Sequence, residues 1–457
     1  MSFIAIDLTL LFIFVLMTIV FLYTHKKNIA RQGLLVLYRT KIGLEIIDYV
    51  SKKYSKLIKP LQYVVIVSGY ILMAIITWFI LKFSWVYLTT PGLAKALKIP
   101  VLTPLVPYID KVFAPGLLPP FYFTYWIIII AIVAIPHEFF HGIFAKFSKI
   151  KVHSTGFGFL GPLIAFFVEP DEKTMNKSKI KDQMAILAAG TFANLLVTII
   201  SAIVMILFFY ATFVPSGVIF STYALSPLNN TNLSIAGNVS FGNNAYLELT
   251  QNNETYITSQ SIQQYINNES VPIIPVYDNS PAFDVQMEGV ISKIDDIAIR
   301  SYNDLNRTLS AHSPGDSVLV ETISGNKTSN YQITLGDNNG RAYLGVGFSQ
   351  PKRSGLFGWL YSLVDKVKHP EVYYQSNIGE FGIFINDLLW WLFLINLSVA
   401  LMNMLPLGIF DGGRFFYLTI LSITKNKKVA EKAFKVSTWF FLLLVLALMI
   451  KWLSIFF

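Results

Sequence analysis

The sequence predicts a polytopic α-helical membrane protein of about six transmembrane helices, with a β-rich domain inserted between the fourth and the fifth. Three observations predict this fold class. Of the 457 residues, 54% are hydrophobic and only 14% are charged, a balance too apolar for one soluble domain of this size. The chain contains six long apolar runs, and a long segment rich in Asn, Ser, Thr and Gly separates the first four from the last two.

Each apolar run reaches the roughly 20 residues that a helix needs to cross a hydrocarbon core of about 30 Å. The first run is too long, and too sparsely preceded by basic residues, to be a cleaved signal peptide, so we expect it to remain as a span. The predicted spans are residues 3–23, 63–88, 122–147, 184–213, 388–407 and 436–456.

Basic residues predict the orientation of these spans, because Lys and Arg near span ends stay on the cytosolic side. They concentrate in residues 26–59, 146–181 and 414–435, which we therefore expect to be cytosolic. The protein is then a multi-pass protein of the cell membrane, surrounded by lipid, with its polar insert on the extracytoplasmic side.

The composition excludes several classes of function. The three basic loops explain the net charge of +9, and no basic face indicates a nucleic-acid partner. The absence of Cys excludes disulfides, thiolate nucleophiles and Cys-ligated metals.

Four regions follow from this pattern. Residues 1–121 hold N-terminal helices and loops, 122–213 the first part of a membrane core, 214–377 the insert, and 378–457 the second part of the core with a C-terminal helix.

Two other segments, 91–120 and 156–170, are apolar but are broken by Gly and Pro. The second is rich in β-formers, so we expect a hairpin or re-entrant ribbon against the core, shielded by protein or bathed in water.

Within the insert, residues 271–348 alternate apolar and polar residues in short runs, with one helical stretch at 302–310. The phrases "NSPAFDVQMEGVISKIDDIAI", "SYNDLNRTL", "PGDSVLVETI" and "YLGVGF" resemble a PDZ domain of the kind attached to membrane and periplasmic proteases. The resemblance implies a groove in which an extended peptide end adds as a strand. The alternative is a folded spacer without a ligand.

The strongest chemical signal is the segment "AIPHEFFHGIF" in the third span. It places His137 and His141 four residues apart, on one face of a helix, with Glu138 beside them. Two imidazoles at this spacing can bind one Zn²⁺, while the adjacent carboxylate reaches water at the metal rather than the metal itself. Ionisable groups within one turn of an apolar helix are costly to bury and usually mark function.

A zinc hydrolase usually uses three protein ligands and keeps a fourth position for water. Asp411, in "ALMNMLPLGIFDGGRFF", is the leading candidate for the third, since two glycines that permit an unusual backbone path follow it. We expect it to end the fifth span. His137 lies about 22 Å along its helix from residue 122, so both residues are near the cytosolic ends of their spans.

Three motifs together resemble the site-2 protease family. They are HExxH at His137 to His141, N-x-x-P-x-x-x-x-D-G-G from Asn403 to Gly413, and G-x-x-x-N in "AAGTFANLL", with Gly190 and Asn194. The family's usual Pro after the Gly is Thr191 here. The resemblance covers spans three to five and the insert.

This resemblance implies an intramembrane zinc endopeptidase that cleaves transmembrane segments of membrane proteins. One Zn²⁺ per chain would be held by His137, His141 and Asp411, and Glu138 would take a proton from the attacking water. Asn194, near the reaction centre in this family, would stabilise or position the oxyanion. The predicted hairpin would hold the unwound substrate by backbone pairing.

Several alternatives stay open at this stage. Asn403 is either a supporting site residue or a packing amide that satisfies carbonyls freed by Pro406. A membrane metalloprotease of the prenyl-protein processing type would need a glutamate ligand on a later helix, and none is evident. A zinc transporter, or a non-catalytic scaffold with a PDZ sensor, would have no need of Glu138. The other histidines, in loops or at span ends, are assigned no role: His25, His153, His312 and His369.

Overall fold

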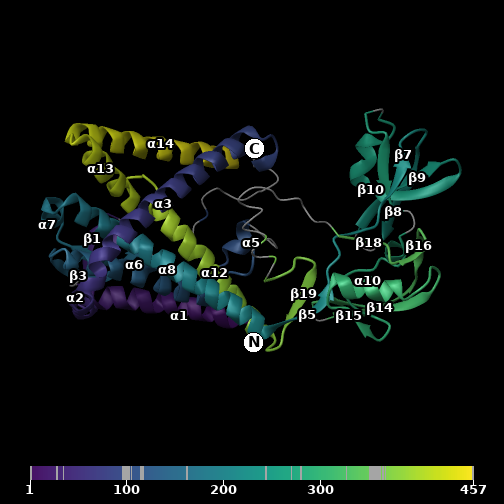
Figure 1. Ribbon diagram of the computed structural model, residues 1–457, viewed down its shortest axis with the longest axis horizontal. Helices are drawn as coiled ribbons and strands as arrows, with labels where there is room; N and C mark the ends of the chain where they lie inside the picture. Colours follow the sequence, from purple (N-terminus) through teal and green to yellow (C-terminus); the bar gives the residue numbers. More distant parts are fainter. Residues whose placement is uncertain are drawn as a thin grey trace. The chain divides into compact units, whose positions relative to one another are not determined.

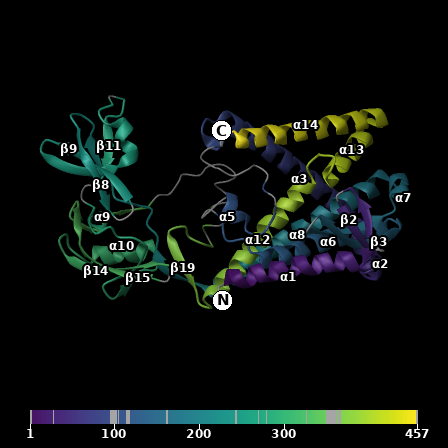
Figure 2. The same ribbon diagram turned by 180° about the vertical axis from the view of Figure 1, so that it is seen from behind.

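A computed structural model of the protein describes residues 3–26, 29–33, 35–94, 103, 105–113, 118–160, 163–241, 244–268, 270–277, 280–325, 327–348, 362, 365 and 367–454. The chain divides into two compact units, which Figures 1 and 2 show from opposite sides. Unit 1 comprises Met1–Leu207 and Phe384–Phe457, and unit 2 comprises Phe208–Ile383. Each unit has its own hydrophobic cores.

Within these residues, six helices are long and apolar enough to cross a membrane. They are α1 (Phe3–Thr24), α3 (Ser55–Thr89), α6 (Phe123–Phe147), α8 (Ile180–Thr212), α12 (Glu380–Asn403) and α14 (Lys427–Leu453). The predicted helices are confirmed, and the protein is an integral multi-pass membrane protein. Three of them, α3, α12 and α14, begin eight or nine residues before the predicted spans (55 against 63, 380 against 388, 427 against 436). Charged residues such as Lys56 lower the hydropathy of a first turn without ending a helix.

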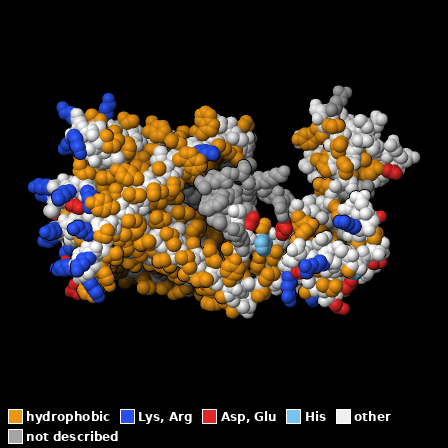
Figure 3. Space-filling model, viewed as in Figure 1, with side chains coloured by type: hydrophobic (Ala, Val, Ile, Leu, Met, Phe, Trp, Pro, Cys, Tyr) orange, Lys and Arg blue, Asp and Glu red, His pale blue; other side chains and the backbone are white. Residues whose placement is uncertain are grey.

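The surface of unit 1 changes character along the helices (Figure 3). Hydrophobic side chains cover its flanks, and only 11% of the apolar part of α1, and of α14, is buried inside the protein. Lys and Arg side chains gather at one end, which carries α2 (Leu44–Lys53), α7 (Glu172–Lys177) and the turn from α13 (Asp411–Thr424) to α14. The three basic segments of the sequence thus share one end of unit 1, as a common side of the membrane requires.

A four-stranded antiparallel sheet lies at the same end of unit 1 (Figure 1). Its order is β1 (Ile29–Gln32), β2 (Leu35–Thr40), β3 (Val152–Leu160) and β4 (Leu163–Pro170). The predicted hairpin is therefore present as β3 and β4, although it begins at residue 152 rather than 156. A Cβ on Gly156 would lie 2.2 Å from the Tyr38 carbonyl oxygen, so only glycine lets β2 pair with β3 there. The β1–β2 hairpin was not predicted, because its strands are short and lie in a basic loop.

An ion pair between Arg39 and Glu169 links β2 to β4 across the intervening strand β3. The Arg39 guanidinium on β2 donates to both carboxylate oxygens of Glu169 on β4, at 2.9 and 3.0 Å. The hydroxyl of Ser154 on β3 donates to the same carboxylate at 2.6 Å. The hydrogen bonds from Arg39 and Ser154 lower the pKa of Glu169 below its usual value, so the pair stays charged over the neutral range.

The N-terminal end of α6 is capped by a side chain from another helix. Asp7 of α1 is fully buried and accepts hydrogen bonds from the backbone N–H groups of Phe123 (2.8 Å) and Thr124 (2.9 Å). The hydroxyl of Tyr108 also donates to it at 2.5 Å. The first N–H groups of a helix have no partner within it, and a carboxylate there also favours the helix dipole. Asp7 therefore connects α1 to the helix that carries HExxH.

Of the irregular segment 91–120, the structure describes one short helix, α5 (Ile109–Phe113), and parts of the loops around it.

Unit 2 is built around a six-stranded sheet with the order β15-β14-β12-β5-β19, in which β13 also pairs with β12. The strands are β5 (Phe213–Val218), β12 (Val290–Ile294), β13 (Ile297–Ala298), β14 (Ser317–Ser324), β15 (Lys327–Thr334) and β19 (Val372–Ser376). Two helices, α9 (Pro281–Asp284) and α10 (Tyr302–Ser310), supply buried Ala282 and Leu305 to the core of this sheet. The predicted helix at 302–310 is confirmed. Two short strand pairs also belong to unit 2: β16 (Gly336–Asn338) with β17 (Arg341–Tyr343), and β18 (Val346–Gly347) with β6 (Thr222–Tyr223).

A second core in unit 2 was not predicted. Its residues come from β7 (Ser226–Asn229), β9 (Asn244–Gln251), β10 (Glu254–Ser259), the 3-10 helix η2 (Gln260–Tyr265), β11 (Ile273–Val276) and the adjoining loops. Strand β8 (Ser234–Phe241) pairs with β9 at the edge of a three-stranded sheet. Strand β11 pairs with β7 here, whereas β5 and β19 join the larger sheet from outside the range 271–348. The range expected for the inserted domain therefore differs from that of the sheet, because the alternation of a strand does not indicate a partner far away in sequence.

Candidate metal centre

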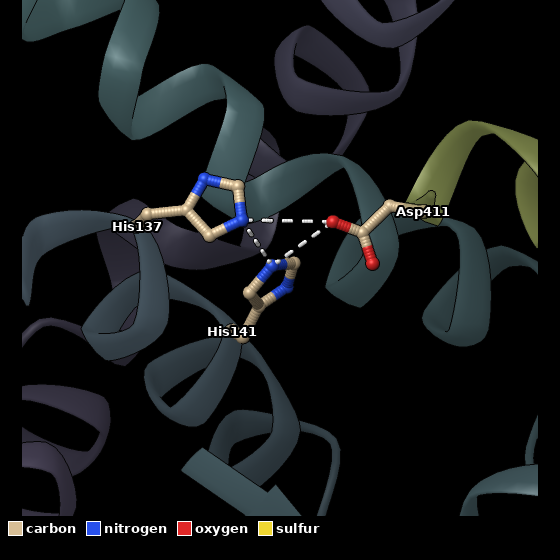
Figure 4. A group of neighbouring side chains, drawn as sticks. All are labelled: His137, His141 and Asp411. Atoms are coloured by element: carbon tan, nitrogen blue, oxygen red, sulfur yellow. Dashed lines mark hydrogen bonds and ion pairs between the residues drawn. The ribbon is translucent and has the colours of Figure 1, made fainter. Parts of the chain in front are cut away.

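Helix α6 and the start of α13 bring three potential ligands together (Figure 4). His137 and His141 project from one face of α6, and their Nε2 atoms are 3.1 Å apart. Oδ2 of Asp411 lies 3.3 Å from Nε2 of His141 and 3.6 Å from Nε2 of His137. Among the described residues, this is the group of His, Asp and Glu side chains arranged to hold a metal ion.

The spacing of these three atoms fits a zinc ion. Ligands held at 2.0–2.1 Å in a tetrahedron lie about 3.3 Å from one another. The three separations, 3.1, 3.3 and 3.6 Å, bracket this value. Two imidazoles and one carboxylate also form a ligand set typical of catalytic zinc, with a fourth position open.

The shape of α8 is a second sign that space is kept for an ion. A Cβ on Gly190 would lie 2.3 Å from Nε2 of His141 and 2.6 Å from Nε2 of His137. The helix backbone thus forms one wall of the centre, and any side chain there would fill the space in front of both imidazoles. This contact gives a physical reason for the glycine of G-x-x-x-N.

The outer nitrogens of both imidazoles have polar partners. Nδ1 of His141 lies 2.7 Å from the Ile186 carbonyl oxygen, to which it can only donate. Its Nε2 therefore keeps a lone pair for a metal. Nδ1 of His137 lies 3.0 Å from the amide of Asn194. Asn194 is fully buried, and its Oδ1 has no partner among the residues described.

The amide of Asn194 can be turned by 180° without moving any other atom, since its oxygen and nitrogen are nearly isosteric. In that orientation Oδ1 accepts the Nδ1–H of His137, which frees the Nε2 of His137 to bind zinc. The resemblance to the site-2 protease family implied that Asn194 faces an oxyanion. The structure places it instead behind His137, against the nitrogen that points away from the centre.

The D-G-G segment positions Asp411 by close backbone packing. A Cβ on Gly412 would lie 2.3 Å from the carbonyl carbon of Met404, and one on Gly413 would lie 2.4 Å from the Leu407 carbonyl oxygen. Only glycine therefore allows the first turn of α13 to lie against the preceding loop. The expectation that Asp411 ends the fifth span is wrong, because α12 stops at Asn403 and Asp411 begins a new helix.

Proline causes this break. Pro406 cannot continue a helix, and its carbonyl accepts a hydrogen bond from Ser437 of α14 at 2.6 Å. Asn403 is half-buried, and among the described residues its side chain has no hydrogen bond to the three potential ligands. None of the other four histidines belongs to a potential metal group in the part of the chain that the structure describes.

Glu138 lies beside the metal centre without being one of the three potential ligands. Its Oε2 accepts a hydrogen bond from the backbone N–H of Val168 on β4, at 2.8 Å. Its Oε1 has no partner within the described ranges. The sequence does not indicate this contact or the one between His141 and the Ile186 carbonyl, because every residue has the same backbone N–H and carbonyl groups whatever its side chain.

An HExxH helix and a carboxylate that meet among apolar helices define a membrane-embedded zinc metallopeptidase. A comparison with protein families agrees, because the profile of Peptidase family M50 matches residues 125–448. The chain therefore belongs to this family, which is the site-2 protease family, and the predicted family and enzyme class are confirmed. A comparison with curated proteins finds no match.

Proposed function

We propose that this metalloprotease cleaves transmembrane segments of other membrane proteins inside the bilayer, as in regulated intramembrane proteolysis. The position of the His137, His141 and Asp411 group carries the proposal. These residues lie in and beside α6, a helix long and apolar enough to cross a membrane. A substrate must therefore reach them within unit 1.

The proposal is tested in cells that carry either the unmodified chain or Glu138→Gln. Full-length substrate proteins should accumulate in the cells with the variant.

His137, His141 and Asp411 would hold the zinc ion, one per chain. When bound, the ion supplies a Lewis acid and lowers the pKa of a water molecule. Glu138 takes the proton from that water and later returns it to the leaving amine. The hydrogen bond from Val168 holds Oε2 in place, so Oε1 is the proposed base. A carboxylate beside the three potential ligands that is not one of them supports this role, since a zinc transporter or a non-catalytic scaffold would have no need of it.

A helical substrate hides its carbonyls in its own hydrogen bonds, so it must unwind before it is cleaved. We propose that β4 receives the unwound segment. This strand is at the edge of its sheet, and its Val168 N–H leaves the sheet to reach the base. Backbone pairing with β4 would therefore hold the substrate beside Glu138.

Asn194 is proposed to orient His137 rather than to contact the substrate. Replacement by Leu removes the acceptor for Nδ1–H and should weaken zinc binding about 10- to 100-fold, whereas Asn194→Asp should keep it near the original affinity. Competition with a graded chelator measures this. Thr198→Val, one turn along α8, is the control. If Asn194→Leu binds zinc normally but loses cleavage, the residue acts on the substrate instead.

The side of the membrane is proposed from the clustered basic end of unit 1, which would be cytosolic, with the insert extracytoplasmic. A tag after Asn253, exposed between β9 and β10, should then be labelled in intact cells. A tag after Lys427, exposed at the start of α14, should be labelled only after the cells are opened. The reverse pattern would overturn the orientation.

The insert is proposed to be PDZ-like and to bind a peptide or substrate end. A groove of 560 Å³ between α10 and residues 341–348 supports this, since Leu305, Leu309 and Phe348 line it together with Arg341. An apolar peptide with a free carboxylate would place its last side chain on the leucines and its charge near Arg341. Fluorescence anisotropy of the full chain with labelled peptides tests this: the peptide with a free carboxylate should bind more tightly than its amidated form. If neither peptide binds, the insert is a spacer without a peptide ligand.

A further inference from the structure

A cavity of 230 Å³ lies beside Glu138, between α6 and the β3–β4 hairpin. It is separate from the space between the three potential metal ligands, because none of those ligands lines it. Both the helix and the hairpin contribute large apolar side chains to its walls. The principal lining residues are Ile135, Phe139, Phe157, Phe166 and Val168, with the carboxylate of Glu138 at one side.

The walls are suited to an apolar group. Apart from Glu138, none of the described residues that line the cavity is charged. The two threonines that also line the cavity already have partners: the hydroxyls of Thr40 and Thr155 lie 3.1 Å apart, and Thr155 donates to the Ile42 carbonyl at 2.6 Å. A cavity of roughly 150 Å³ with apolar walls is enough to bind benzene. This one therefore has room for a side chain as large as that of Phe.

The position of the cavity relates it to the reaction. The peptide bond under attack must lie within reach of the Glu138 carboxylate, and Glu138 also borders the cavity. In an extended chain, neighbouring residues are about 3.3 Å apart and their side chains alternate in direction. A residue next to the scissile bond can thus direct its side chain into this space while the bond itself stays at the metal centre.

We propose that this cavity is a specificity subsite, which takes a large apolar side chain, such as that of Leu, Met or Phe, from a residue adjacent to the scissile bond. The proposal rests on the proposed function and adds a substrate preference to it. Burial of that side chain in an apolar pocket favours cleavage beside large apolar residues over cleavage beside Ala, Gly or charged residues.

The test uses the full-length chain in detergent and a library of peptides made from solubilised membrane proteins. Mass spectrometry of the products gives the residues at each position around every cut. We expect one position adjacent to the cut to be enriched in Leu, Met and Phe. For a synthetic substrate with one mapped site, Leu→Ala at that position should lower kcat/KM at least about tenfold.

Two variants change the cavity in opposite directions. Ile135→Phe should fill it and shift the preference toward Ala and Gly, whereas Phe166→Ala should enlarge it and admit Trp. Ile132→Phe is the matched control, since Ile132 is one turn away on α6, is 37% exposed against 38% for Ile135, and does not line the cavity. Zinc content and melting temperature check that each variant is folded.

The outcomes separate the two proposals. Cleavage with no preference beside the cut, or a preference that Ile135→Phe and Phe166→Ala leave unchanged, would overturn the subsite and leave the peptidase intact. A cavity that holds only a lipid chain would give that same result. If the unmodified chain produces no more cuts than Glu138→Gln, the proposed function itself fails.

Discussion

Replacing Glu138 by Gln should reduce peptide-bond cleavage by roughly 10²- to 10⁴-fold, the usual contribution of a positioned general base. The substitution keeps the shape of the side chain and an oxygen that accepts the Val168 N–H. It leaves His137, His141 and Asp411 in place, so zinc content should stay unchanged. Cleavage of a mapped substrate and zinc per chain are measured on the same purified sample.

Glu431→Gln provides the control, because Glu431 is an exposed residue of α14. It should change neither zinc content nor cleavage. If Glu138→Gln loses zinc in proportion to its activity, then Glu138 is a ligand or a structural residue, and its assignment as the base is wrong.

Gly190→Ala should remove zinc from the protein, although it changes no potential ligand. The added Cβ would stand 2.3 Å from Nε2 of His141 and 2.6 Å from Nε2 of His137, so both imidazoles would have to move off the metal position. Since a shift of even a few tenths of an ångström exceeds the tolerance of zinc–ligand distances, zinc per chain should fall from one to near zero. Metal analysis after dialysis against a graded chelator series measures this.

Two further variants give the scale of that experiment. His141→Ala shows the result of a lost ligand, and Gly237→Ala shows the effect of the same chemical change at a glycine with no neighbour within 4 Å of the added carbon. Gly190→Ala should resemble the first. Unchanged zinc affinity in Gly190→Ala would mean that the ion does not lie between the imidazoles and α8.

Much of the helical unit could be predicted because its signals are local. Hydropathy indicates each long span, and the HExxH spacing alone puts His137 and His141 on one helix face. The structure brings Asp411 to both of them, although the sequence suggested that Asp411 ends a span. A hydropathy run continues smoothly through residues 404–407, so only the effect of Pro406 on backbone hydrogen bonds reveals that a new helix begins at Asp411.

The features that the sequence did not predict depend on contacts between distant segments. Strands β1 and β2 are too short to identify by themselves: β2 is fixed by pairing with β3, and β1 by pairing with β2. Helix α10 was predicted at residues 302–310, where the structure has it, and its apolar residues lie on one face of the helix. By contrast, the pairing of β5 with β12 joins residues 218 and 291, and no local pattern indicates such a partner. Asn194 was found by its motif, but its contact with the outer side of His137 required the structure.

The most direct test of the central claim is to map where a transmembrane substrate is cut. The purified chain and a membrane protein that accumulates with Glu138→Gln would be placed together in liposomes, and mass spectrometry would give the masses of the products. We predict that both new ends lie inside the apolar segment of the substrate and that Glu138→Gln yields neither product. Cuts confined to the soluble flanks of the substrate, or equal cutting by Glu138→Gln, would contradict an intramembrane zinc peptidase.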